Sequence, residues 1–229
     1  MSIKVMAAAV ATAAGLAVAT CGPACAAPGG ALAQLTGTQL LAALVPASDF
    51  PAGYTLDKSS TYDTGSHLLT APAKYHLATM SCVSFGTHFG TKGFGETAIA
   101  ADSFSSADFG RGFGQQVYQF RTAGAASAFF SGLRAIPRRC PQFVLTQPGV
   151  NAKVATVVAS AAPIAGHRTF QVHETGTFLG VKIGLSFVFT VAGTDVFIAG
   201  NLGVHGAPPA SPSPRTTMAR LIKRVRSAD

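Results

Sequence analysis

The second half of the chain alternates apolar and polar residues, and this alternation predicts β-strands. The strongest run has an apolar residue at every second position from Val181 to Val191. The next four residues, Ala-Gly-Thr-Asp, have the composition of a tight turn that leads back into a strand over 196–202. Two further strands are expected upstream, over residues 154–159 and 168–174. The pattern therefore predicts an antiparallel meander.

Apolar residues at helical spacing predict helices on both sides of this meander. One helix is capped by Thr38, a second begins at Thr122 and is stopped by Pro137, and a third covers residues 216–226. A weaker helical pattern lies around residues 75–83. Further strands are expected over 54–60, 96–104 and 115–121. Helices that precede, interrupt and follow antiparallel strands predict an α+β fold, in which helices pack on a single antiparallel sheet.

Residues 1–27 have the layout of an export signal peptide, with Lys4 before an apolar run and small residues after it. We therefore expect the protein to be extracellular or part of the cell envelope. After this signal, residues 28–37 are expected to form a short linker. Residues 38–229 are enough for one domain with its own core.

The sequence leaves two possible processing sites at the end of this signal. Cys21 closes a loose match to a bacterial lipobox and would become a lipidated first residue. Ala24-Cys25-Ala26 is instead an Ala-x-Ala cleavage site of the ordinary secretory type. The first predicts a lipid anchor on the outer face of the plasma membrane, and the second predicts a secreted protein.

Composition narrows the range of partners. Charged residues make up 11% of the chain and hydrophobic residues 48%, so the chain is not of the disordered class. The formal net charge of +8 favours anionic lipids or anionic wall polymers as partners. Nucleic acid is not expected, because no recognition motif is present and the expected compartment does not contain it.

Cys82 and Cys140 are the only cysteines beyond the expected signal. In an oxidising compartment such a pair is expected to form a disulfide. The alternative, a thiol pair for metal or redox chemistry, lacks both Cys-x-x-Cys spacing and a nearby histidine.

No pattern of catalytic residues emerges from the sequence. There is no Gly-x-Ser-x-Gly elbow, and the chain has only two glutamates, Glu96 and Glu174. The histidines lack the spacing of metal ligands. We therefore predict no catalytic residue, no metal ligand and no cofactor.

One group of residues is a candidate ligand-binding stripe. On a strand, alternate residues share one face, and that face would carry His167, Thr169, Gln171 and His173. The stripe could line a ligand cleft, or it could be the wet face of a half-buried sheet.

Two other segments also allow two interpretations each. Residues 85–114 contain five Phe-Gly pairs, which either fill the core beneath turns or form a mobile aromatic loop that contacts lipid. The basic C-terminal segment, residues 215–226, either touches an anionic surface or is a solvated helix face.

Several motifs resemble the extracellular sensor domain family of PknH-type kinases, an actinobacterial family that also occurs as free-standing lipoproteins and secreted proteins. The resemblance rests on the Leu40–Leu44 run, Phe50–Tyr54, Cys82, Val117–Phe120, Ala125–Leu133, Cys140 and residues 221–225. It implies an antiparallel sheet flanked by helices, with a cleft for a ligand, in a domain that senses or binds and does not catalyse.

The leading hypothesis is a non-enzymatic exported domain that binds a small molecule, a lipid or a wall component in a cleft beside its sheet. One alternative is an envelope hydrolase with a dispersed active site. The other is a wall-associated structural or interaction protein without a pocket.

Overall fold

The structure is a computed structural model that describes residues 34–57, 62–63, 65–70, 72–88, 90–107, 110–147, 150–178, 180–204 and 211–228. The expected export signal, with Cys21 and the Ala-x-Ala site, lies outside the described residues. The expected linker is described only from Gln34 onward. Residues 34–37 are not linker, because Leu35 is buried in the core, Gln34 donates a hydrogen bond to the oxygen of Phe120, and the first helix begins at Gly37.

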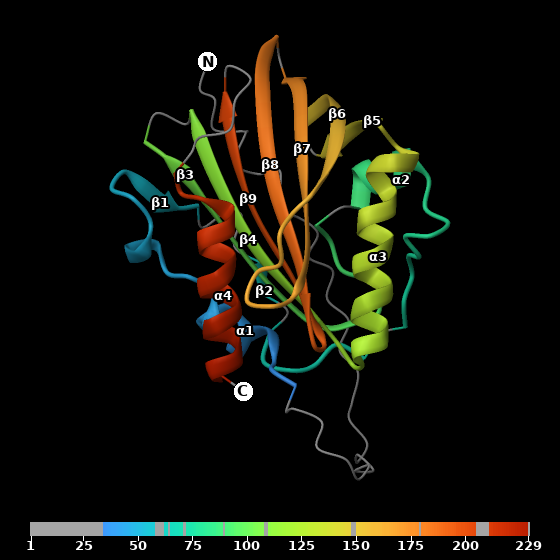
Figure 1. The fold of residues 1–229 in the computed structure, drawn as a ribbon, viewed down its shortest axis with the longest axis vertical. Helices are drawn as coiled ribbons and strands as arrows, with labels where there is room; N and C mark the ends of the chain where they lie inside the picture. The colour runs from blue at the N-terminus through green and yellow to red at the C-terminus, as the bar shows by residue number, and fades with distance from the viewer. Residues whose placement is uncertain are drawn as a thin grey trace.

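The domain is built on one antiparallel sheet (Figure 1). Its order is β1-β3-β4-β9-β8-β7-β6-β5, and β2 also pairs with β3. The strands are β1 (Tyr54–Leu56), β2 (Tyr62–Asp63), β3 (Glu96–Ser106), β4 (Arg111–Phe120), β5 (Gln142–Gln147), β6 (Val150–Ser160), β7 (Arg168–Phe178), β8 (Val181–Ala192) and β9 (Asp195–Val204). The predicted fold class is confirmed, including the meander of its C-terminal half.

Helices cover both faces of the sheet. The described helices are α1 (Gly37–Ala43), the short 3-10 helix η2 (Ala47–Asp49), α2 (Cys82–His88), α3 (Ala123–Arg139) and α4 (Pro214–Ala228). Side chains of α1 and α4 pack on one face, and those of α2 and α3 pack on the other. The alternation on β8 serves both layers, because Val188 faces α4 whereas Phe189 faces α3.

The predicted start of the first helix and the predicted end of the second were wrong. The first helix is capped by Thr36, which forms a capping box with Gln39, and not by Thr38. Pro137 does not stop α3, which ends two residues later at Arg139. A proline in the last turn removes one helical hydrogen bond, yet the backbone N–H of Cys140 still donates to the oxygen of Ile136 at 2.7 Å.

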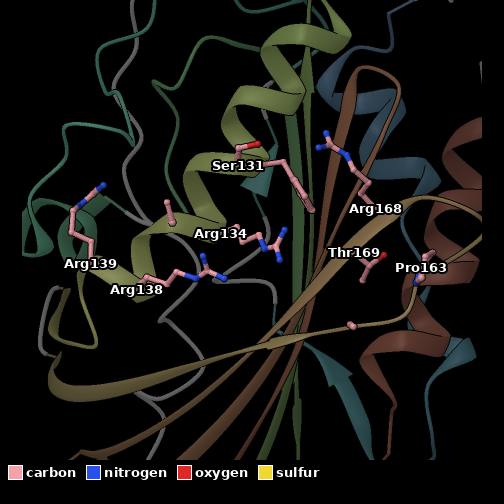
Figure 2. A pocket seen from close by; sticks show the side chains of 10 residues that line it. Ser131, Arg134, Arg138, Arg139, Pro163, Arg168 and Thr169 are labelled. Carbon is pink, nitrogen blue, oxygen red and sulfur yellow. The ribbon is translucent and has the colours of Figure 1, made fainter.

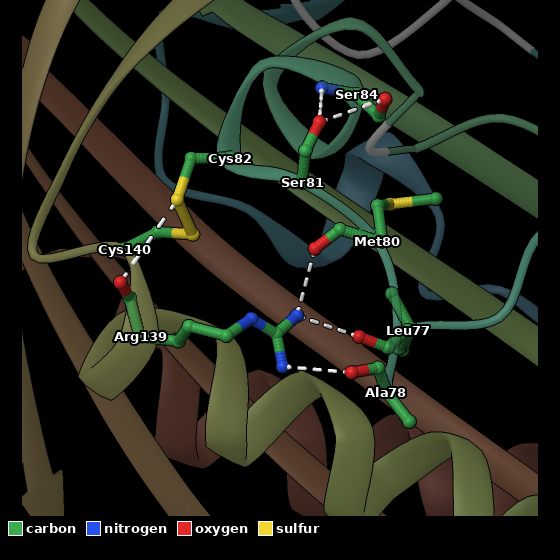
Figure 3. The surroundings of a disulfide bond; sticks show 8 residues. All are labelled: Leu77, Ala78, Met80, Ser81, Cys82, Ser84, Arg139 and Cys140. Carbon is green, nitrogen blue, oxygen red and sulfur yellow. Dashed lines mark hydrogen bonds between the residues drawn. A yellow bond between two sulfur atoms is a disulfide. The ribbon is translucent and has the colours of Figure 1, made fainter.

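The helix expected around residues 75–83 is also misplaced, because α2 begins at Cys82. Ser81 caps it by accepting a hydrogen bond from the backbone N–H of Ser84. The backbone carbonyl groups just before α2 accept hydrogen bonds from a side chain. Leu77, Ala78 and Met80 direct their backbone oxygens at the guanidinium of Arg139, so they are not available to a helix (Figure 3).

The predicted Cys82–Cys140 disulfide is confirmed, with an S–S distance of 2.02 Å. It joins the first residue of α2 to the residue that caps α3. Arg139, the neighbour of Cys140, donates hydrogen bonds of 2.7 to 3.2 Å to the same segment (Figure 3). The disulfide and this arginine together hold α2 and α3 as one clasp over the sheet.

Across the described part of the chain, every helix is too short or too polar to cross a bilayer.

Candidate functional site

A groove lies between α3 and the segment that leads into β7 (Figure 2). Its volume is about 720 Å³. From α3 it is lined by Phe130, Ser131, Arg134, Ala135, Arg138 and Arg139, and from the facing segment by Ala161, Pro163, Arg168 and Thr169. This space, which we call the arginine groove, is as large as many pockets that hold small ligands.

Helical spacing explains how α3 supplies one wall. Ser131, Arg134 and Arg138 lie three and four residues apart, so their side chains project from the same side of the helix. The opposite side of α3 carries the apolar residues Leu133 and Ile136, which are buried in the core. One helix therefore anchors itself in the sheet and presents cations to the groove.

Arg168, at the start of β7, forms the facing wall. Its guanidinium lies 5.4 Å from the ring centroid of Phe130 and donates to the hydroxyl of Ser127. These contacts hold the Arg168 side chain against α3 at the edge of the groove (Figure 2).

The groove contains cations without acidic partners. None of its lining residues is an aspartate or a glutamate. Arg139 is engaged by backbone oxygens, whereas Arg134 and Arg138 make no hydrogen bond or ion pair with any residue that the structure describes. Arg138, in the last turn of α3, also interacts favourably with the helix dipole. Arg134 lies one turn earlier and Arg168 lies on β7, so the dipole does not account for these two cations.

This arrangement can bind an anion. A guanidinium offers a planar fork of N–H donors that matches phosphate and carboxylate groups. Phe130, Ala135 and Pro163 add apolar surface beside the cations. The groove therefore suits a molecule with an anionic group and an apolar part.

The predicted stripe lies on β7 and just before it, on the sheet face that α4 partly covers. Thr169 is half-buried and its hydroxyl lies 3.1 Å from that of Thr190. Gln171 donates to the hydroxyl of Ser186 at 2.9 Å, and His173 is exposed. Burial first, and the charge of Arg226 second, lower the pKa of His167. Of these four residues, Thr169 also lines the arginine groove.

The stripe continues past His173 into a second, open groove of about 820 Å³ over β5 to β8. The strand register places Thr175 and Thr177 on the same face as Lys153 and Lys182. The ligand-binding role of the stripe stays a prediction, and this groove extends the surface on which it can be tested.

Sequence reasoning did not single out Arg134, Arg138 and Arg168. A signal was present in the helix, since Arg134 and Arg138 are four residues apart and no acidic residue lies within four residues of either. The facing wall had no such signal, because only the fold brings the start of β7 against α3.

The Phe-Gly segment contributes mainly core in the ranges that the structure describes. Phe85 and Phe113 are buried, and Phe94 packs against the α3 side of the core. The phenylalanines at 89 and 109 lie outside the described residues.

Three of the basic residues in the C-terminal segment bind backbone oxygens. Arg215 donates to Ala162, Arg220 to Asp49, and Arg224 to the end of α1. These three therefore have structural contacts in the folded domain.

No protein-family model and no curated protein matches this sequence. Among solved structures, the extracellular domain of PknH from Mycobacterium tuberculosis is similar, with a TM-score of 0.59 and 15% identity over 84% of this chain and 97% of that chain. A putative uncharacterized protein from Mycobacterium smegmatis gives a TM-score of 0.41 at 14% identity, covering 78% of this chain and 92% of that one. The first likeness confirms the resemblance seen in the sequence at the level of the fold.

Proposed function

Starting from the fold that this chain shares with the PknH extracellular domain, we propose that it is an exported, non-enzymatic domain that binds an anionic molecule of the cell envelope in the arginine groove. The observation that carries the proposal is the meeting of Arg134 and Arg138 with Arg168 around one groove whose lining includes no carboxylate.

Export is supported by three independent features. The first 27 residues have the layout of a signal peptide, the domain has a disulfide, and the similar structure is that of an extracellular domain. The protein would be lipid-anchored or secreted, depending on how the signal ends. In both cases the groove would be exposed to lipids and wall components.

The ligand class follows from the groove's walls. Free guanidinium groups bind phosphate or carboxylate, and the apolar residues beside them accept a short hydrocarbon part. A phosphorylated or carboxylated small amphiphile, derived from a lipid or from the wall, meets both requirements. Binding would require no covalent chemistry, in keeping with a sensing or carrying role.

Hexyl phosphate is a suitable probe, and hexanol is its uncharged control. We expect saturable binding of hexyl phosphate by isothermal titration calorimetry and weaker binding of hexanol. Arg134→Gln with Arg138→Gln should weaken hexyl phosphate binding by about tenfold or more, because each charge-assisted hydrogen bond contributes about 1.5 kcal/mol or more.

Lys223→Gln is the matched control, since it removes one positive charge from an exposed position on α4, away from the groove. Equal affinity of the wild type and the double arginine variant would contradict the proposal, as would a failure of the wild type to bind hexyl phosphate.

A further inference from the structure

The open groove of about 820 Å³ over β5 to β8 shares no lining residue with the arginine groove. Its exposed side chains alternate along the strands and therefore lie on one face of the sheet, the face on which α4 packs against β8 and β9. We call this space the lysine groove. Its exposed side chains are Gln142, Val144, Lys153, Thr175, Thr177 and Lys182.

The strand register sets the positions of the two lysines. Lys153 on β6 pairs with Thr177 on β7, and Thr177 pairs in turn with Lys182 on β8. Neighbouring strands lie about 4.8 Å apart, so the two lysines project from positions about 10 Å apart with a hydroxyl between them. The next row on this face contains the shorter side chains of Ala155 and Thr175, which form a lower floor beside the lysines.

This floor crosses the strands. On its other side lies the pair of Val157 and His173, both exposed, and His173 is the last residue of the binding stripe predicted from the sequence. From β5 to β8 the floor spans three strand spacings, or about 14 Å. Because β5 is the last strand in the sheet order, a chain lying on this floor can continue past the sheet edge.

The lysine groove contains two cations and no acid to neutralise them. Glu174 is the only acidic residue in the sequences of β5 to β8. Strand alternation turns it to the opposite face, where it lines a small cavity under α3. Lys153 and Lys182 make no hydrogen bond or ion pair with any residue that the structure describes. Their charges are therefore available to an anionic partner.

The form of the groove selects among anionic partners. A bilayer presents a flat surface, whereas this floor lies between two rows of side chains. The backbone groups of β6 and β7 are paired on both sides within the sheet, so the floor has few of them to offer a peptide. Gln142, Thr175 and Thr177 instead supply neutral side-chain donors and acceptors, which match the hydroxyl groups of sugars.

We propose that the lysine groove binds an extended acidic glycan. Lys153 and Lys182 contact anionic groups at two points along its chain, and the threonine hydroxyls between them bind sugar hydroxyls. This second site goes beyond the proposed function and does not depend on it. A glycan held here leaves the arginine groove free for a small amphiphile, so the domain could be attached to a wall polymer while it binds its ligand.

Octagalacturonate, in which every sugar unit carries a carboxylate, is a suitable probe, and uncharged maltooctaose is its control. We expect saturable binding of octagalacturonate by isothermal titration calorimetry and weaker binding of maltooctaose. Lys153→Gln with Lys182→Gln should weaken octagalacturonate binding by about fivefold or more, as expected for the loss of two exposed ion pairs. Lys153→Arg with Lys182→Arg keeps both charges and should bind as the wild type does.

Lys74→Gln with Lys92→Gln is the matched control, because it removes the same two charges from exposed positions before β3. This variant should keep the wild-type affinity, and an equal loss in both pairs would overturn the inference by showing attraction to net charge alone. Octaglutamate tests the alternative of an acidic peptide. If it binds as tightly as octagalacturonate, or if octagalacturonate binds no better than maltooctaose, the inference is wrong.

The arginine variants separate this inference from the proposed function. Arg134→Gln with Arg138→Gln should keep octagalacturonate binding, and the Lys153 and Lys182 double variant should keep hexyl phosphate binding. Loss of octagalacturonate binding in the arginine variant alone would overturn the inference and leave the role of the arginine groove intact. If hexyl phosphate does not bind while octagalacturonate binds through the two lysines, the proposed function is wrong and the glycan site stands.

Discussion

The chain's two glutamates show how one functional group acts in opposite ways in two environments. Glu96 is buried, but its carboxylate accepts hydrogen bonds from the backbone N–H groups of Gly93 and Phe94 at 2.6 and 2.7 Å. Glu174, half-buried on β7, lines a small cavity whose other walls are apolar except for Thr156. The two backbone N–H groups satisfy the Glu96 side chain and fix a turn, whereas desolvation raises the pKa of Glu174 to about 7.

Glu174 should make the unfolding free energy depend on pH. Because its pKa is higher in the folded state, about 7 against 4.5, the folded state holds the proton more tightly. Stability should be highest below pH 4.5, decline as pH rises to 7, and stay level above it, with a total loss of about 2 to 3 kcal/mol. Urea unfolding at pH 4.5 and 7.5 measures this loss.

Glu174→Gln should remove that part of the decline. Asp102, whose pKa burial raises from 3.8 to about 6, supplies a separate decline at lower pH that the variant keeps. Superimposable stability curves for the wild type and the variant would show that Glu174 is not desolvated in the folded protein.

Among the elements, α2 depends on long-range contacts for its position. It is seven residues long, too short to be stable by itself, and packs on β5. Gly86 permits that packing, because a Cβ at this position would overlap the backbone oxygen of Val144. The position of α2 is therefore set by its contact with β5 and by the disulfide.

Gly86→Ala should destabilise the protein by about 2 kcal/mol or more, since the obstacle is backbone and cannot rotate away. Thermal unfolding and urea titration measure the change. Gly124→Ala is the matched control, because Gly124 is exposed on α3, an added Cβ there would meet only the Thr122 hydroxyl at 3.8 Å, and alanine favours the helix. A loss at position 124 as large as that at position 86 would contradict this explanation.

The same dependence explains which elements could be predicted from the sequence. The helices α3 and α4 carry complete apolar stripes, and β8 alternates along its whole length, so local pattern was sufficient. Strand β5 was not predicted, because its pairing with β6 and contact with α2 determine it more than its own sequence does. The arginine groove could not be predicted for a similar reason, since Arg168 meets α3 only in the folded chain.

At the scale of the whole molecule, the central sheet is a wall shared by two separate apolar clusters. One lies under α1 and α4 and contains Phe104 and Met218, and the other lies under α2 and α3 and contains Phe129 and Phe170. The first is closed by elements from the two ends of the domain, and the second is closed by the disulfide.

Replacing Cys82 and Cys140 by alanine should therefore loosen the α2–α3 side most. The bond closes a loop with a sequence separation of 58 residues. Chain entropy gives a loss of about 4 kcal/mol for a loop of this size. Chemical unfolding of the double variant measures the total, and hydrogen exchange locates it. Exchange that accelerates first in α1 and α4 would contradict this view.

Arg224 affects the stage at which the domain can finish folding. From α4 it donates to the backbone oxygens of Ala42, Ala43 and Leu44, at the end of α1. The two helices lie side by side on one face of the sheet (Figure 1). A polypeptide that emerges amino end first, from a ribosome or a translocation pore, has its opening helix in place long before this clamp arrives. Until the final turns emerge, that helix lacks its partner, so the finished domain forms only on the far side of whatever passage the chain has crossed.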